Sequence, residues 1–296
     1  MRLFLTSIMA LGLGLLFQSA AQAEDAKPES INVGQFEIFI IPDKELEMHQ
    51  NLIPDIEKFP ELAAIFENAP VPGVNRAYFF RTDSHNVLVD TGWGKDLKTK
   101  GEALENLRKA GVAPEDVTDI LLTHMDGDHI GGMLDNGKPV FPNATVWVSA
   151  PELEAWKNGN IKARGQDFLD FARAMVGAYQ DKIRPFNFGE AILPGVTAID
   201  ASGHTPGHTA YQIDSGDARM LIAGDLIQVA PVQLLQPELS SIYDMDPEMA
   251  AKRRLELLDK IANGSTILGA MHIPMISPVK KTEEGKFLMR QPRGMM

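Results

Sequence analysis

Short apolar segments that run directly into histidine or aspartate constrain this sequence more than any other feature. Residues 120–123 form one such segment and lead into 124–129, which reads His-Met-Asp-Gly-Asp-His. Two further strands, predicted over 196–200 and 220–223, precede a Gly-His-Thr-Pro-Gly-His segment and a Gly-Asp pair. Open α/β sheets build their sites at the carboxyl ends of strands. The pattern therefore predicts a layered α/β fold with polar groups at the strand ends.

The rest of the chain alternates predicted strands with predicted helices. A helix is expected from the Asp246-Pro247 start to Gly264, and another from the capping-box pattern at 99–102 to Gly111. No repeat or change in composition interrupts residues 24–296, so one domain is predicted there. The other predicted strands cover 31–41, 76–81, 86–90, 145–149, 211–214 and 266–270, and the other helical segments lie at 60–68, after Pro151 and at 167–179.

Residues 1–23 have the pattern of a secretory signal peptide. Arg2 precedes a mostly apolar run at 3–17, and a small-x-small pattern ends at Ala23. The run is shorter than the ~20 residues that a membrane-spanning helix needs. We therefore expect a periplasmic or secreted product that has no membrane segment after signal removal. A buried helix or an uncleaved anchor is the alternative.

The composition limits the chemistry that the chain can carry out. It has no cysteine, which excludes disulfides, cysteine nucleophiles and thiolate metal sites. The net charge of −12 is unfavourable for binding nucleic acid, so a small-molecule substrate is expected instead. Any metal ion must be held by the seven histidines and by carboxylates, which suit zinc, manganese or iron.

Five of the seven histidines lie near three predicted strand ends. Random placement would scatter them through helices and loops, although an ordinary polar turn is the alternative for each segment taken alone. The candidate ligands are His124, Asp126, Asp128, His129, His204, His208, Asp225 and His272.

These segments, in this order, resemble the metallo-β-lactamase superfamily. Its motifs are His-x-His-x-Asp-His, a later histidine in a Gly-His-Thr turn, an aspartate after a strand and a final histidine. The resemblance covers about residues 33 to 287 and implies a four-layer αββα sandwich with a metal site at one sheet edge. A narrower similarity, carried by 224–233 and 270–274, is to the methyl parathion hydrolase-like branch, whose members are exported and suggest a homodimer.

The resemblance implies two divalent ions, most simply zinc. One group of ligands would be His124, Asp126 and His208, the other Asp128, His129 and His272. Asp225 would bridge the ions, Asp128 and Asp225 would be the catalytic residues, and Asp90 and His204 would support the ligands from behind.

Asp126 departs from the family pattern, which usually has histidine there. As a ligand it would make the donor set more negative and would favour harder ions such as manganese or iron. A neutral set of ions and ligands would also bind anions less well, which favours neutral substrates. The alternative is that Asp126 points away and the first site is weak or empty.

A divalent ion can lower the pKa of a bound water from 15.7 to about 7, which gives a hydroxide able to attack carbon or phosphorus. We therefore expect an exported dinuclear hydrolase of neutral lactones, esters or organophosphate triesters. Trp156 and Phe171 match the aromatic walls of the branch, although a helix core explains them equally well, and Phe168 is expected in the core. A β-lactamase-like amidohydrolase, a redox enzyme and a metal-binding scaffold without turnover remain alternatives.

Overall fold

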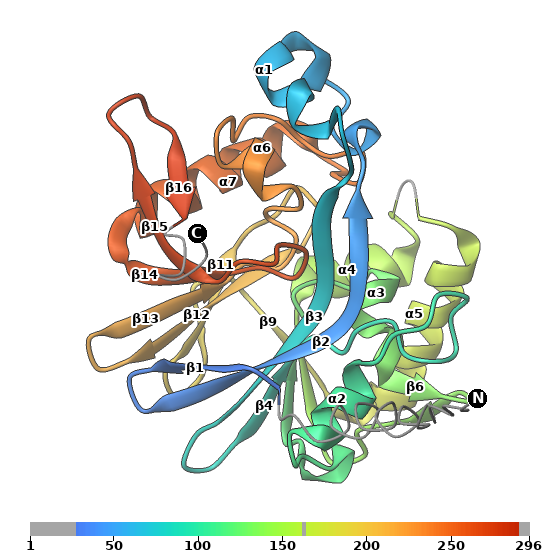
Figure 1. Cartoon of the computed structure of the whole chain (residues 1–296). Helices are drawn as coiled ribbons and strands as arrows, with labels where there is room; N and C mark the ends of the chain where they lie inside the picture. Colours follow the sequence, from blue (N-terminus) through green and yellow to red (C-terminus); the bar gives the residue numbers. More distant parts are fainter. Residues whose placement is uncertain (1–27, 162–163, 290–296) are drawn as a thin grey trace, which may run out of the picture.

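The computed structural model describes residues 28–161 and 164–289. Most of the described strands form two seven-stranded sheets (Figure 1). The first sheet has, in spatial order, β1 (Ser30–Val33), β2 (Phe36–Met48), β3 (Val71–Arg81), β4 (Asn86–Val89), β5 (Asp119–Leu121), β8 (Thr145–Ser149) and β9 (Ile183–Phe186). The second has β10 (Ala191–Leu193), β11 (Val196–Asp200), β12 (Thr209–Ser215), β13 (Ala218–Ile222), β14 (Asn263–Gly269), β15 (Ser277–Lys281) and β16 (Phe287–Met289), and β6 (Leu134–Asp135) pairs separately with β7 (Lys138–Pro139).

Alternation along each strand explains why the two sheets stack. In β3, Tyr78 and Phe80 lie in the core between the sheets, whereas Ala77 and Phe79 lie in the core beneath the helices. Tyr211 and Ile213 of β12 face Tyr78 and Phe80 from the second sheet in that same central core. Side chains alternate between the two faces of a strand, so a continuous apolar run is buried on both sides.

Helices cover the outer face of each sheet and complete four layers. The first sheet packs against α2 (Ala103–Lys109), α4 (Ala150–Asn158) and α5 (Gln166–Tyr179). The second packs against α6 (Ala230–Gln233) and α7 (Pro247–Ile261). Figure 1 shows these two groups of helices on opposite sides, with α1 (Pro60–Ala63) projecting at the top. The predicted αββα sandwich is confirmed.

The candidate site lies where several strands end together. The strands β4, β5 and β8 are parallel, and so are β13 and β14. The loop after β5 holds residues 122–126 and leads into the short helix α3 (Gly127–Ile130). The segments after β11, β13 and β14 supply the other candidate ligands. Several loops from both sheets therefore contribute to one site.

Most predicted elements exist, but some of their limits were wrong. The strand predicted over 31–41 is two strands, because Gly34, at a φ of 59°, turns the chain between β1 and β2. The capping-box helix begins only at Ala103, whose N–H donates to Asp43 Oδ1 at 2.9 Å, and Glu102 makes no side-chain cap. The strands β9, β10, β15 and β16 were not predicted; β9, β10 and β16 lie at sheet edges, and β15 lies beside β16.

The segment predicted to be a signal peptide, 1–23, lies outside the described residues. Among the residues that are described, no helix has both the length and the apolar character needed to cross a membrane.

Candidate metal centre

Four imidazoles direct their Nε2 atoms toward the same group of carboxylates. His124 and His204 lie 3.4 and 3.3 Å from Asp126 Oδ2, and His204 is also 3.4 Å from Asp225 Oδ2. His129 Nε2 lies 3.2 Å from Asp225 Oδ1, and His272 Nε2 lies 3.0 Å from Asp225 Oδ2. Asp225 therefore stands between the histidines of the two candidate metal groups.

Asp128 faces the same two histidines as Asp225. Its Oδ2 lies 3.6 Å from His129 Nε2 and 3.4 Å from His272 Nε2. Two groups of donor atoms, each within 4.8 Å of one another, could hold a metal ion: His124, His204 and Asp225, and Asp128, His129 and His272.

Each of the four imidazoles is oriented through its other nitrogen. Nδ1 of His129 bonds Asp90 Oδ2 at 2.7 Å, and Nδ1 of His204 bonds Asp244 Oδ1 at 3.0 Å. Nδ1 of His272 lies 3.0 Å from the Val74 carbonyl oxygen. Such contacts fix the tautomer that leaves Nε2 as an electron-pair donor, as in histidines that bind metals.

Asp90 supports two of these imidazoles from behind. It accepts the Thr123 hydroxyl proton at 2.7 Å, and Thr123 Oγ1 in turn lies 3.0 Å from His124 Nδ1. Asp90 itself is buried and has a φ of 58°, a conformation that is rare for a residue with a side chain. Asp90 thus contacts His129 directly and His124 through Thr123, and its supporting role stays a prediction.

Unpaired buried atoms provide a test of whether a metal ion fits. Nε2 of His124, Nε2 of His129 and Oδ1 of Asp225 are buried and have no hydrogen-bond partner among the described residues. Leaving buried polar atoms unpaired costs free energy, so such atoms in a native site call for an explanation. All three belong to the candidate donor set, and imidazole and carboxylate donors suit zinc, so the residues fit a metal ion.

The pKa shifts show that the centre favours positive charge. Burial by itself lowers the pKa of His272, but the charge of Asp225 and the contacts to Asp128 raise it to about 10. Burial likewise opposes protonation of His204, yet contacts to Asp126 and Asp244 raise its pKa to about 9. Burial also raises the pKa of Asp225, but His272 and His129 bring it well below its usual value. The carboxylates can thus stabilise a proton or a metal ion at the same atoms.

His208, which was predicted as a ligand, has no free nitrogen. Its Nδ1 lies 2.8 Å from the Ala201 carbonyl oxygen, and its Nε2 accepts the Asp225 backbone N–H at 2.9 Å. Burial and the neighbouring His124 and His204 lower its pKa well below the usual value, which fits a neutral ring. In this structure His204 faces the carboxylates, and His208 accepts the backbone N–H of Asp225; the predicted ligand role of His208 stays a prediction.

Asp126 faces the centre but is also held by an arginine that the sequence did not identify. Arg164 Nε donates to Asp126 Oδ1 at 2.7 Å, and Arg164 Nη2 lies 2.5 Å from Asp126 Oδ2. Arg164 Nη2 is also 3.4 Å from His204 Nε2, and Nη1 donates to the Tyr243 carbonyl at 3.1 Å. The positive charge of Arg164 offsets the negative charge that Asp126 adds, so the expected neutral donor set is not supported.

Other buried residues hold the site together, and their roles were also missed. Glu152 accepts hydrogen bonds from Met125 N–H and Gly207 N–H, and so joins two of the ligand-bearing loops. Asn75 Nδ2 donates to the carbonyl and the carboxylate of Asp128, at 3.0 and 3.2 Å. These residues lie far from the motifs in sequence, and a single glutamate or asparagine carries no signal that could have identified them.

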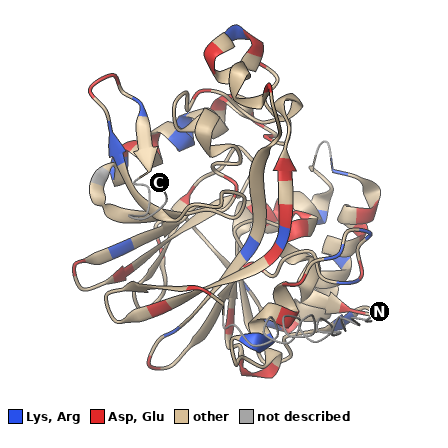
Figure 2. Ribbon diagram, viewed as in Figure 1, with Lys and Arg blue, Asp and Glu red and all other residues tan. Residues whose placement is uncertain are grey.

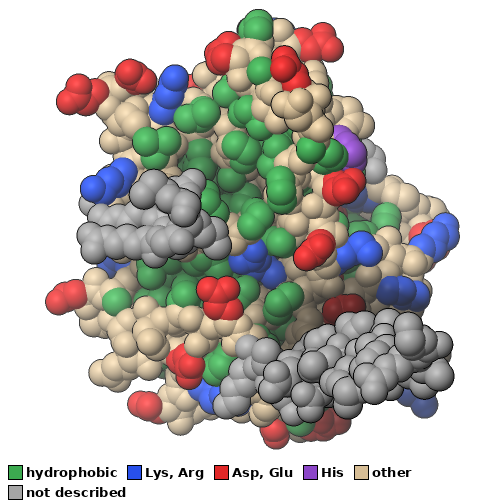
Figure 3. Space-filling model, in the orientation of Figure 1, with side chains coloured by type: hydrophobic (Ala, Val, Ile, Leu, Met, Phe, Trp, Pro, Cys, Tyr) green, Lys and Arg blue, Asp and Glu red, His purple; other side chains and the backbone are tan. Residues whose placement is uncertain are grey.

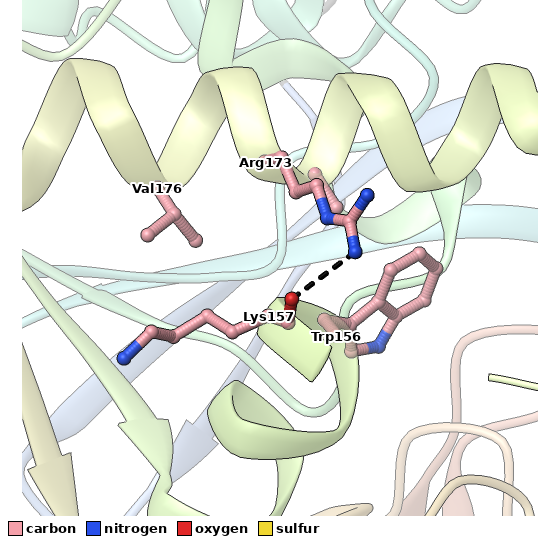
Figure 4. A pocket seen from close by; sticks show the side chains of 5 residues that line it. Trp156, Lys157, Arg173 and Val176 are labelled. Atoms are coloured by element: carbon pink, nitrogen blue, oxygen red, sulfur yellow. Dashed lines mark hydrogen bonds between the residues drawn. The ribbon is translucent and has the colours of Figure 1, made fainter. Parts of the chain in front are cut away.

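The aromatic residues predicted to contact substrate lie in the helix core instead. Trp156 is 1 % exposed and Phe171 9 % exposed, and both belong to the core under the first sheet. The Trp156 ring borders a small cavity of about 230 Å³ between α4 and α5, also lined by Lys157, Arg173 and Val176 (Figure 4). Its Nε1 donates to Glu152 at 2.8 Å. Neither residue is supported as a wall over the metal ligands.

Phe168, which was expected in the core, packs partly buried against the core under the first sheet and also lies against the metal-binding loop. A Cβ atom placed on Gly127 would meet the Phe168 ring at 2.6 Å, so the ring rests directly on the loop backbone. The ring is half-buried and lies 6.2 Å from that of Trp93, measured between centroids.

Comparisons with known proteins point to one protein family. Residues 70–272 match the model of the metallo-beta-lactamase superfamily. A probable metallo-hydrolase of Mycobacterium tuberculosis is 29 % identical over 183 residues, 49 % of this chain and 54 % of that protein. Ribonuclease Z of Thermobifida fusca is 34 % identical over 177 residues, 56 % of this chain and 50 % of that protein. The chain thus spans about half the length of these curated relatives.

A solved structure matches over much more of its length. AidC, described as a dizinc quorum-quenching lactonase in complex with the product N-hexanoyl-L-homoserine, superposes with a TM-score of 0.79 and 25 % identity. The match covers 90 % of this chain and 98 % of that chain.

Proposed function

The chain belongs to the metallo-β-lactamase superfamily and is a metal-dependent hydrolase, and from this premise we propose a dinuclear enzyme that hydrolyses neutral lactones. Carboxylic esters and organophosphate triesters are the related substrates in the proposed class. The observation that carries the proposal is the convergence of four Nε2 atoms on the Asp225 and Asp126 carboxylates, with three donor atoms left unpaired.

Divalent ions bound by these donors would activate a water molecule and polarise the carbonyl oxygen of the substrate. The chain itself orients the donors. Asp90, Asp244 and the Val74 carbonyl fix the imidazoles, and Asn75 fixes Asp128. Asp225 is 4 % exposed, and the four histidines are also buried, so the site excludes bulk water from most of the donor set. Few histidine side chains reach the face shown in Figure 3.

Support for a partly apolar substrate comes from the neighbourhood of Arg164. Tyr243, whose carbonyl accepts the Arg164 hydrogen bond, is 48 % exposed, and Ile242 beside it is 46 % exposed. The similar lactonase structure, which holds an acylated product, is consistent with this surface. A neutral donor set and aromatic walls made by Trp156 and Phe171, which the sequence suggested, do not support this substrate class.

The resemblance to ribonuclease Z makes RNA the competing substrate class. Neutralising phosphates needs clustered lysine and arginine, but the net charge is −12, and basic residues are interspersed with acidic ones along the ribbon in Figure 2. We therefore propose that the substrate is a small molecule.

The test is hydrolysis by the purified chain after loading with Zn²⁺ or Mn²⁺. The panel holds an N-acyl homoserine lactone, a p-nitrophenyl ester, a phosphotriester, a cephalosporin and a structured RNA. We expect turnover of the lactone, and a loss of at least about 100-fold in kcat/KM in Asp225→Asn and His272→Ala, because each change removes a donor. Asp217→Asn and His49→Ala, which alter exposed residues outside the site, are the matched controls.

The pattern of activity separates the alternatives. Cleavage of RNA alone would replace the proposed substrate class, and cleavage of the cephalosporin alone would favour an amidohydrolase. Bound metal without turnover of any substrate would favour a scaffold.

We also propose that the protein is exported and that residues 1–23 are removed. Expression of the whole chain in a Gram-negative host, followed by fractionation and N-terminal sequencing, should yield a periplasmic protein that begins at Glu24. A cytoplasmic product that retains Met1 would refute export. The expected homodimer stays a prediction, which light scattering of the mature chain can test.

A further inference from the structure

Arg164 contacts His204, a donor of the first candidate metal group, and Asp126, whose carboxylate lies beside His124 and His204 of that group. Its guanidinium holds both oxygens of Asp126, at 2.7 and 2.5 Å, and its Nη2 lies 3.4 Å from His204 Nε2. The side chain is only 7 % exposed, and the Tyr243 carbonyl fixes its other arm. Arginine forms such two-point contacts with carboxylates through its planar, permanently charged fork. The guanidinium therefore places a permanent positive charge in contact with Asp126 and next to His204.

Among the described residues no arginine or lysine contacts a donor of the second metal group directly, although the charge of Arg164 also acts on Asp128 at longer range. Asp128 is held by the neutral amide of Asn75, and the imidazoles of His129 and His272 are held by Asp90 and by the Val74 carbonyl. Each of these contacts leaves the Nε2 atoms and the Asp128 carboxylate facing one another. The two groups are thus chemically unequal, although both use two histidines and carboxylates.

We propose that Arg164 makes metal binding at the two groups unequal, by competing with a divalent ion for Asp126 and repelling an ion held by His124 and His204. The group of Asp128, His129 and His272 then binds its ion first and more tightly. A fixed positive charge a few ångströms from a divalent ion is strongly unfavourable in a buried site. This inference rests on the proposed metal centre and does not depend on the substrate.

The experiment is a titration of the mature chain, first stripped by a chelator, with Zn²⁺ and separately with Mn²⁺. Competition with a metal-sensitive fluorophore gives the two stepwise affinities, and elemental analysis after desalting gives the ions bound per chain. For the wild type we expect a second ion bound at least about tenfold more weakly than the first. In Arg164→Gln the second affinity should rise about tenfold, and the first should stay within about twofold.

The direction in which Arg164→Gln changes metal affinity distinguishes the loss of a competing cation from disruption of the loop. A substitution that only disturbed the loop would weaken metal binding, whereas loss of a competitor strengthens it. Arg173→Gln is the matched control, because it removes the same charge from an exposed residue that contacts the Lys157 carbonyl. Thermal unfolding of each variant verifies that the fold is retained.

A double-mutant cycle tests whether Arg164 acts through Asp126. The Asp126→Asn background lacks the charge that holds the guanidinium. In that background Arg164→Gln should change the logarithm of the affinity for the second ion by less than half of the change that it causes in the wild type. Equal affinities for both ions in the wild type, or an Arg164→Gln titration identical to that of Arg173→Gln, would overturn the proposal while leaving the hydrolase function intact. Failure to bind any divalent ion would instead overturn the proposed function and this inference together.

Discussion

His208 Nε2 accepts the backbone N–H of Asp225 at 2.9 Å, whereas His204, four residues earlier, directs Nε2 toward the side chain of Asp225 at 3.4 Å. One histidine of this turn therefore fixes the main chain of the central carboxylate, and the other faces the carboxylate itself. In this arrangement the one lone pair of a neutral His208 ring accepts the Asp225 N–H, so we expect His204, rather than His208, to donate to a metal ion.

The first prediction separates these two histidines. His204→Gln should lower the affinity for the second metal ion by about 100-fold or more, because it removes a donor, and should also lower thermal stability, because it removes the contact to the buried Asp244. His208→Gln should retain both ions but unfold at a lower temperature, because a glutamine cannot reproduce both buried contacts. Metal analysis of the two variants distinguishes the roles, and thermal unfolding measures the stability of each. Loss of one ion in His208→Gln alone would show that the roles had been assigned the wrong way round.

The sequence located the site but could not orient its members. Short strands followed by histidine or aspartate identified four ligand-bearing loops, because the end of a strand fixes where the next residue lies. His204 and His208 share a turn containing Pro206 and Gly207, and the spacing cannot tell which ring faces inward. That choice is made by a hydrogen bond to Asp244, which lies in a distant segment, and by one to the Ala201 carbonyl at the start of the same loop, and residue spacing reveals neither.

Contacts between residues that are far apart in the sequence could not be predicted either, because they also depend on how distant segments pack together. Arg164 and Asp126 are 38 positions apart, and nothing in either segment predicts that they pair. The helix predicted over 167–179 is confirmed as α5. The sequence could not show that Phe171 points into the core and that Phe168 lies against Gly127, because that depends on how α5 packs on the loop.

The second prediction concerns Glu152, a buried carboxylate that joins two ligand-bearing loops. Its oxygens accept from Met125 N–H, Trp156 Nε1, Thr205 Oγ1 and Gly207 N–H. Glu152→Gln replaces one acceptor oxygen by a donor, so buried donors lose their partner, at a cost of about 1–3 kcal/mol in the free energy of unfolding.

Urea unfolding of the metal-free chain measures this cost. Glu154→Gln, which changes an exposed residue on the same helix, should stay within about 0.5 kcal/mol of the wild type. A Glu152→Gln variant as stable as the control would contradict the role given to this carboxylate.

The third prediction is a pH dependence of stability carried by Tyr179. Burial raises the pKa of its phenol to about 12, against an ordinary value near 10, and its hydroxyl donates to the Met133 carbonyl at 3.0 Å. Because the folded pKa is the higher one, this stabilisation is complete below about pH 10 and is lost as the pH rises through about 12. A shift of two pKa units corresponds to a loss of about 3 kcal/mol for this group.

Tyr179→Phe should lower stability at pH 8 and make stability fall less steeply between pH 10 and 12. Urea unfolding at a series of pH values gives both quantities for each chain. Parallel curves for the variant and the wild type over that range would exclude the linkage.

The last prediction concerns Gly224, which precedes Asp225 at a φ of 53°. A Cβ atom at this position would lie 2.4 Å from His208 Nε2 and 3.0 Å from Thr123 Cβ. Gly224→Ala therefore adds a clash to the conformational strain and should break the bond between His208 and the Asp225 backbone. Gly216→Ala isolates the strain, because Gly216 has a similar φ of 60° and no atom within 4 Å of its added Cβ. We expect a cost of about 1 kcal/mol for Gly216→Ala, and for Gly224→Ala about 3 kcal/mol or more together with weaker metal binding. Equal costs in urea unfolding, with metal affinity unchanged, would mean that the loop relaxes and that close packing on His208 does not hold Asp225 in place.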